Sequence, residues 1–111
     1  MKNLAEFQII GNVGSIKPVG ATLKVAICAN YNEQSESGEW KTHEYWNEVT
    51  VFGDQFKTRV KKLAVGDLVW ARGRVRKSKY SRGEETVYAV DFIADELSAL
   101  AHRDAAGAAL A

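Results

Sequence analysis

Apolar and polar residues alternate along most of this chain, and a period of two is typical of β-strands with one buried face. The alternating segments predict five strands, which cover residues 5–13, 21–31, 40–52, 67–80 and 86–97. Turn-forming or unpatterned stretches predict loops over residues 14–20, 32–39 and 81–85. The first of these loops contains Pro18 and Gly20, which commonly interrupt regular structure.

One segment has a different period. Phe56, Val60 and Leu63 recur at i, i+4 and i+7, which predicts a short amphipathic helix that ends by Gly66. The resulting order is strand, strand, strand, helix, strand, strand. It predicts an all-β domain with one helix, a five-stranded OB-fold barrel with the helix between strands 3 and 4. Such barrels bind oligonucleotides on one face and through two of their loops.

The third predicted strand has aromatic residues on an unexpected side. In the segment "EYWNEVTVFG", alternation places Val49 and Val51 toward the core. Trp46 and Phe52 then fall on the opposite side, among charged residues. Two large rings on the charged side of a strand call for an explanation other than packing in the barrel core.

Length and cysteine content restrict the class of protein. A chain of 111 residues is the size of one domain with one core. Cys28 is the only cysteine, so no internal disulfide is expected, and no Cys/His cluster has metal-ligand spacing. There is no signal-peptide pattern and no apolar run of membrane-spanning length, so we expect a cytoplasmic protein without membrane association.

The net charge of +1 conceals a segregation of charge along the chain. Residues 57–82 contain ten Lys or Arg residues against Asp67 alone, a net charge of +9. The remaining residues contain five Lys or Arg against thirteen Asp or Glu, a net charge of −8. A local basic region of this kind can attract a polyanion even when the overall charge is small.

Aromatic and cationic side chains recur on the sides of strands 3 and 4 that face away from the predicted core, and we expect the OB topology to make these sides adjacent. Unpaired bases stack on flat side chains while cations follow the phosphates, which favours single-stranded nucleic acid. The predicted nucleic-acid-binding residues are Trp46, Phe52, Tyr80, Trp40, Arg72, Arg74, Arg76, Lys77, Lys79 and Arg82.

Structural interpretations compete with this one. An aromatic residue on the polar side of a strand can belong to a cross-strand pair or an oligomer contact. Alternating arginines are commonly solvated or paired with glutamate. Trp40, at the start of its strand, fits packing against the neighbouring loop as well as it fits the binding face. No nucleophile elbow, phosphate loop or pair of catalytic carboxylates is found, so we expect no enzyme, no cofactor, no metal and no small-molecule substrate.

Residues 4–100 resemble the bacterial single-stranded DNA-binding protein family. The matching segments, in order, are "IIGNVG", "EYWNEVTVFG", "VGDLVWARGRVRKSKY" and "VYAVDFIADEL". The resemblance implies an OB-fold, binding of single-stranded DNA in replication, recombination or repair, and a nucleoid-associated location. It also implies that Trp46, Phe52 and Tyr80 stack bases, with Tyr80 where the family usually has tryptophan.

Departures from the family pattern bear on assembly and partners. The family usually forms a homotetramer, but Asn47 stands where a histidine often makes a subunit contact, so a dimer is the alternative. The sequence resembles a short form without the family's acidic C-terminal tail. We expect an OB-fold domain over residues 4–100 and an alanine-rich tail over residues 101–111 that extends a helix or is disordered.

Two other functions remain open at this level. The chain could be an adaptor similar to primosomal OB-fold proteins, acting mainly through protein–protein contacts. It could also prefer RNA to DNA, although nothing in the residues marks a reader of the 2′-hydroxyl group.

Overall fold

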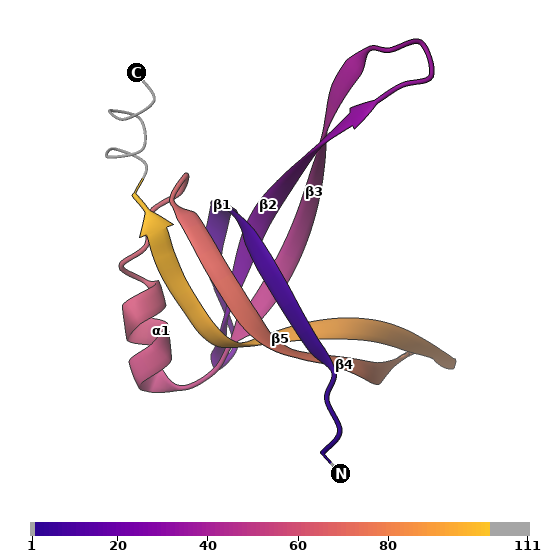
Figure 1. The fold of residues 1–111 in the computed structure, drawn as a ribbon. Helices are drawn as coiled ribbons and strands as arrows, with labels where there is room; N and C mark the ends of the chain where they lie inside the picture. The colour runs from indigo at the N-terminus through magenta and orange to yellow at the C-terminus, as the bar shows by residue number, and fades with distance from the viewer. Residues whose placement is uncertain (1, 103–111) are drawn as a thin grey trace.

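The computed structural model describes residues 2–102 and contains five strands and one helix in that range. The elements are β1 (Glu6–Val19), β2 (Thr22–Gln34), β3 (Trp40–Val51), α1 (Asp54–Val60), β4 (Leu68–Arg82) and β5 (Glu85–Ala101). The strands close into a barrel in the order β1-β2-β3-β5-β4 (Figure 1). The predicted barrel, with its helix between the third and fourth strands, is confirmed.

The barrel core is formed by the apolar sides of the strands. Val25, Val49 and Val69 have no exposed surface, as the alternation predicted. Helix α1 lies against the barrel and buries Val60, while Phe56 is partly buried against the same core. The helix therefore contributes Phe56 and Val60 of the predicted apolar stripe, while Leu63 packs against the core from beyond the end of the helix.

The prediction of a loop over residues 14–20 was wrong, because β1 continues as a strand to Val19. Residues 6–12 of β1 pair with β4, and residues 12–19 pair with β2. A β-bulge between Val13 and Ser15 marks the change of partner, and bulges bend strands in this way. Pro18 is accommodated because that half of β1 pairs only with β2 and leaves its other edge free.

The expectation that strands 3 and 4 are adjacent was also wrong. Strand β5 lies between β3 and β4 in the barrel. Its contact with β3 is a short parallel ladder in which Val49 pairs with Phe92 and Thr50 with Ile93. The outward faces of β3 and β4 are thus on the same wall of the barrel but separated by a full strand.

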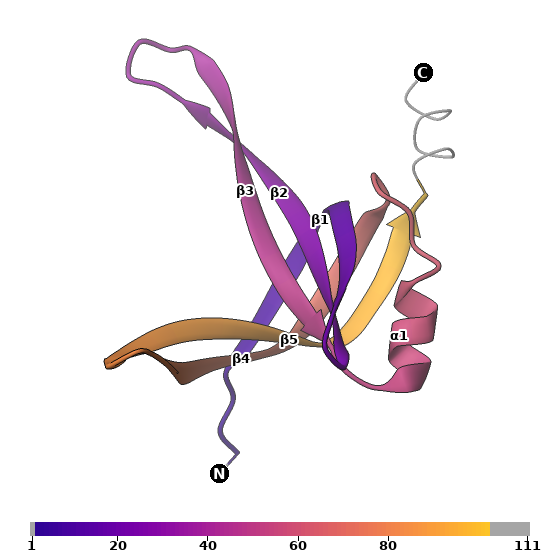
Figure 2. The ribbon, with the colours of Figure 1, turned by 180° about the vertical axis from the view of Figure 1, so that it is seen from behind.

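Two hairpins extend beyond the barrel. Figures 1 and 2 show the β2–β3 hairpin and the β4–β5 hairpin diverging from the region where the strands meet. We call residues 28–46 the β2–β3 arm and residues 76–91 the β4–β5 arm. The two arms hold most of the predicted aromatic site residues.

The arms are longer than the sequence predicted, so the loops over residues 32–39 and 81–85 are shorter. In the β2–β3 arm, pairing continues to Gln34 and Trp40, and the Ser35 N–H donates to the Glu39 carbonyl at 2.7 Å. In the β4–β5 arm, pairing continues to Arg82 and Glu85. Two residues, Gly83 and Glu84, form that turn, and Gly83 has a φ of 63°, which glycine adopts readily.

The helix is shorter than predicted and ends at Val60. The chain tightens after it, with the Leu63 N–H donating to the Val60 carbonyl at 3.0 Å. The Ala64 N–H then donates to the buried Asp67 carboxylate at 2.9 Å, and Gly66 turns the chain with a φ of 96°. Gly66 therefore belongs to the turn into β4 rather than to the end of the helix.

At the other end of the chain, β5 runs to Ala101, so the first residue of the expected tail lies in a strand. His102 follows outside any helix or strand, and the rest of the expected alanine-rich tail, residues 103–111, lies outside the described residues.

Candidate nucleic-acid interface

The four predicted aromatic residues are all exposed on the outside of the barrel and its arms. Trp46 is 56% exposed, Phe52 46%, Tyr80 49% and Trp40 68%. Aromatic side chains are well buried on average, and several exposed apolar side chains on one surface can mark a contact site. The four rings are therefore accessible to a ligand.

Trp46 lies on a glycine of another strand. It pairs with Cys28 of β2, and its six-membered ring reaches across β2 to Gly14 at the bulge of β1. A Cβ atom at position 14 would overlap that ring. The bulge thus provides a flat seat that fixes the indole while leaving its outer face open.

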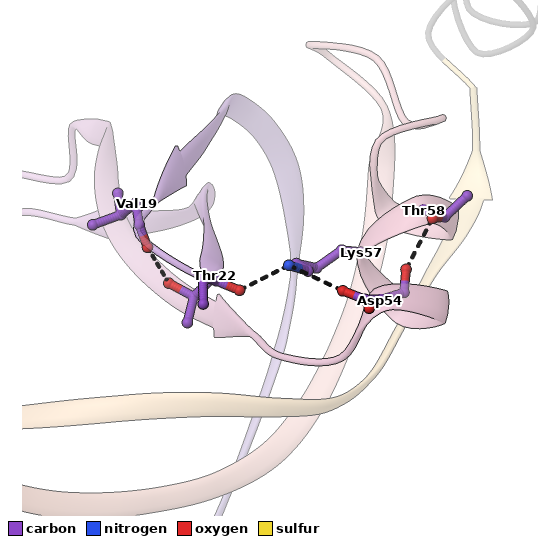
Figure 3. A network of polar contacts seen from close by, with 6 residues as sticks. Val19, Thr22, Asp54, Lys57 and Thr58 are labelled. Carbon is purple, nitrogen blue, oxygen red and sulfur yellow. Dashed lines mark hydrogen bonds and ion pairs between the residues drawn. The ribbon is translucent and has the colours of Figure 1, made fainter.

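Phe52 does not belong to β3, which ends at Val51, so strand alternation does not determine its direction. Gly53 follows with a φ of 92° and a carbonyl that accepts the Lys57 N–H at 2.9 Å, which begins α1. Figure 3 shows the same helix tied to the β1–β2 turn, because the Lys57 ammonium donates to the Ala21 carbonyl at 2.8 Å. Lys57 also forms an ion pair with Asp54 at 3.5 Å (Figure 3). These contacts fix the segment in which Phe52 lies.

Three of the four arginines of β4 are paired with carboxylates. Arg72 contacts Glu6 at 2.9 Å and Glu96 at 3.5 Å. Arg74 contacts Asp95 at 3.6 Å, and Arg76 contacts Asp91 at 3.4 Å. The sequence left pairing with acidic residues as an alternative to phosphate binding. Within the domain, these three arginines do pair with acidic residues. Such exposed pairs are weak, so a phosphate could compete for each guanidinium.

Lys77 and Lys79 differ from the arginines in both face and pairing. Alternation along β4 places them on the side of Val75, whereas Tyr80 and Arg82 lie on the side of Arg76. Neither lysine forms an ion pair with any residue in the described part of the chain. The structure therefore divides the predicted cations between two faces of the β4–β5 arm.

Sequence reasoning missed Tyr88. It is 61% exposed on β5, opposite Lys79, and the Lys77 ammonium lies 4.6 Å from the centre of its ring. The alternation of Tyr88, Val90 and Phe92 in the fifth predicted strand was the available signal. A strand was predicted here, but no face was assigned to Tyr88, and the length of the arm beyond the barrel was not predicted.

A second aromatic cluster also escaped prediction. Tyr31 and Tyr45 meet edge to face with their ring centres 5.6 Å apart, and His43 stacks on Tyr45 at 6.2 Å. His43 also lies 3.4 Å from the Glu33 carboxylate. These residues share the core-side face of the β2–β3 arm, opposite the face that carries Trp40 and Trp46.

The surroundings of Trp46 are acidic. Glu44 and Glu48 lie two residues before and after it on the same face of β3. Burial raises the pKa of the neighbouring Cys28 thiol, and the negative charge of Glu44 raises it further. The electrostatic environment of the indole therefore differs from that of the cationic β4–β5 arm.

Comparison with known proteins identifies the family. The model of the single-strand binding protein family matches residues 4–100. The chain belongs to the single-strand binding protein family. Family membership assigns single-stranded DNA binding to the chain, and the family is a non-catalytic one. The predicted resemblance is thereby confirmed.

Solved structures of the family share the fold at low sequence identity. The Plasmodium falciparum protein in complex with single-stranded DNA is 19% identical, with a TM-score of 0.72 and coverage of 90% of this chain and 97% of that one. The small single-stranded DNA-binding protein of Streptomyces coelicolor is 17% identical, with a TM-score of 0.60 and coverage of 88% and 95%. The mitochondrial Rim1 protein of Saccharomyces cerevisiae is 19% identical, with a TM-score of 0.65 and coverage of 90% and 98%.

Two negative findings apply to the described residues. Among residues 2–102, no three His, Cys, Asp or Glu side chains form a group that could hold a metal ion. Within the same range, no helix has the length and apolar character needed to cross a membrane.

Proposed function

We propose that this single-stranded DNA-binding protein holds its ligand by stacking unpaired bases on Trp46, Phe52 and Tyr80. Cationic side chains of β4 bind the phosphates by donating to their oxygens, and Trp40 extends the aromatic surface along the β2–β3 arm. Because every base has a flat face, binding of this kind depends weakly on sequence. Duplex DNA hides these faces and is expected to bind poorly.

The single observation that supports this mechanism best is the exposure of all three rings on the outside of a closed barrel. Trp46 supports it further, because Gly14 leaves room for the indole without covering its outer face. The proposed cations are Arg72, Arg74, Arg76, Lys77, Lys79 and Arg82. Arg72, Arg74 and Arg76 would exchange a carboxylate partner for a phosphate, whereas Lys77 and Lys79 have no ion-pair partner among the described residues.

The test is a titration of the full chain with poly(dT) followed by tryptophan fluorescence. Stacking of bases on Trp46 and Trp40 should quench the emission, and the affinity should fall as the salt concentration rises. A matched duplex should quench weakly at the same concentration. Strong binding without any quenching would show that the ligand is held away from the indoles, and would contradict the stacking mechanism.

We also propose that the protein self-associates as a homotetramer, with a homodimer as the alternative. Exposed apolar side chains outside the proposed binding face, among them Ile10 and Val19 of β1, support a subunit contact. Light scattering with and without a long oligonucleotide would distinguish the tetramer, the dimer and a monomer.

A role as an adaptor for other proteins is the second candidate. The acidic β2–β3 arm favours it, because the Tyr31–His43–Tyr45 cluster lies on a surface unsuited to phosphates. Micromolar or weaker binding to long oligonucleotides would support this role. With either function, we propose that the protein acts in the cytoplasm on DNA exposed during replication, recombination or repair.

A further inference from the structure

The β4–β5 arm has two faces of different electrostatic character. One face carries Tyr80 between Arg76 and Arg82, with Asp91 and Glu85 directly across the ladder. The other face carries Tyr88, Lys77 and Lys79, together with Val90. The first face has a carboxylate opposite each of its arm arginines, whereas the second has lysines and no carboxylate among its paired residues.

We infer that the lysine face is a second stacking subsite for single-stranded DNA, in which one base stacks on Tyr88 and adjoining phosphates bind Lys77 and Lys79. This inference rests on the proposed function, because it adds a subsite to the same DNA path. Both faces of the β4–β5 arm would then bind DNA. A single strand of DNA could pass from the Tyr80 face to the Tyr88 face.

The charge of this face suits a polyanion. Successive residues on one face of a strand are about 7 Å apart, so Lys77 and Lys79 form a short cationic row beside the ring. Within residues 2–102, neither ammonium group has an ion-pair partner to displace. Each phosphate contact made here releases counterions without first breaking a carboxylate pair.

The ring of Tyr88 is available to a base. The Lys77 ammonium lies 4.6 Å from the ring centre, and Lys79 is the residue paired with Tyr88 across the ladder. A cation–π contact at an exposed site is weaker than base stacking, so a base can replace the ammonium over the ring. The displaced lysine remains beside the ring, where it can bind the phosphate of the stacked nucleotide.

The experiment compares Tyr88→Leu and Tyr80→Leu with the unaltered protein, using dT oligomers that span the range of about 4–16 nucleotides bound by one OB-fold. Tyr88→Leu should leave the shortest oligomers unaffected and weaken the longest by at least about fivefold. Tyr88→Phe keeps the ring and should bind long oligomers within about twofold of the unaltered protein. Tyr31→Leu, an exposed tyrosine on the other arm, is the matched control and should have no effect.

A crosslinking measurement locates the base directly. Irradiation of the full chain with bromodeoxyuridine-substituted oligomers should give a peptide crosslinked at Tyr88 with long oligomers only. If Trp46→Ala and Tyr80→Leu weaken binding but Tyr88→Leu does not, the second subsite is overturned and the proposed function stands. If none of the three affects binding, the proposed function itself fails. A change in solution mass with Tyr88→Leu, without any crosslink, would mean that a second copy covers this face, and would also overturn the inference.

Discussion

The two arms of the barrel share one architecture and differ in charge. The β2–β3 arm has four glutamates against Lys41, a net charge of −3 over residues 28–46. The β4–β5 arm has four cations against three carboxylates, a net charge of +1 over residues 76–91. Both arms carry exposed aromatic rings on each face. The comparison separates two contributions to the proposed DNA binding, since on that proposal the acidic arm would offer mainly stacking surface and the other arm stacking and charge.

The difference also shows that charge must be assigned to faces rather than to segments. The excess of +9 over residues 57–82 suggested one continuous basic surface. In the structure, three of the four arginines of β4 form ion pairs with carboxylates of β1 and β5, which are Glu6, Glu96, Asp95 and Asp91. Those acidic residues lie outside the basic window in the sequence but beside it in space. The positive charges of Lys77 and Lys79 are not neutralised by ion pairs among the described residues, whereas those of Arg72, Arg74 and Arg76 are.

The largest expected effect comes from removing the main ring of the acidic arm. Trp46→Ala should weaken binding of a long dT oligomer by roughly 10- to 100-fold, because base stacking contributes about 1–3 kcal/mol. Fluorescence anisotropy of a dye-labelled oligomer at low salt measures this loss. Tyr45→Ala changes a ring on the opposite face of the same strand and should alter the affinity by less than about threefold. Equal losses in the two variants would contradict the assignment of the DNA to the Trp46 face.

A smaller effect is expected when the seat of the indole is altered. Gly14→Ala places a Cβ where the Trp46 ring lies, so the ring must shift. Binding should fall several-fold, but less than in Trp46→Ala, because a displaced indole still offers a face. The tryptophan emission of the free protein should change as well. Ser15→Ala alters the neighbouring bulge residue without entering that space and serves as the control. Unchanged emission and affinity in Gly14→Ala would show that the seat has no role.

The salt dependence of binding should distinguish the two kinds of cation. The double variant Lys77→Gln, Lys79→Gln should lower the slope of log affinity against log salt by about 1.4, since each phosphate contact with a single strand contributes about 0.7. Arg72→Gln should lower it by less than about 0.7, because its guanidinium is shared with Glu6 and Glu96. Affinity at several salt concentrations gives both slopes. A larger change in Arg72→Gln than in the lysine variant would reverse the ranking of the two faces.

The barrel was predictable because its core residues obey local rules. Val49 alternates with polar neighbours, and Phe56 and Val60 fall at helical spacing, so strands and helix could be found from short windows. The pairing of β5 between β3 and β4 depends on contacts between distant segments, and no local period encodes it. The sequence therefore predicted the strands, the helix and their order along the chain. It did not predict which strands are neighbours in the barrel.

The candidate site was predictable only in part. Trp46 and Tyr80 stood out as aromatic residues on the polar sides of their strands, and both are exposed. The pairing of the arginines with carboxylates could not be assigned, because Glu6 and Asp91 lie far from them in the sequence. Tyr88 was overlooked because its alternation with Phe92 resembles a core pattern until the strand is seen to leave the barrel. A periodic pattern gives the face of a side chain but not where the core ends.

The smallest expected effect probes the acidic field around Trp46 through Cys28. Burial and the Glu44 charge both raise the pKa of this thiol, so at neutral pH it remains protonated and reacts slowly with alkylating reagents. Glu44→Gln removes the second cause, so the pKa should fall and the rate of alkylation by iodoacetamide at pH 8 should rise. The reaction should remain slower than that of an unperturbed thiol, because burial is the larger cause and remains. A rate–pH profile should move to lower pH in Glu44→Gln and stay in place in the control Glu39→Gln, at the arm's tip. An unmoved profile in Glu44→Gln would mean that the Glu44 carboxylate does not raise the pKa of Cys28. The difference in charge between the two arms would then not extend to the surroundings of the Trp46 indole.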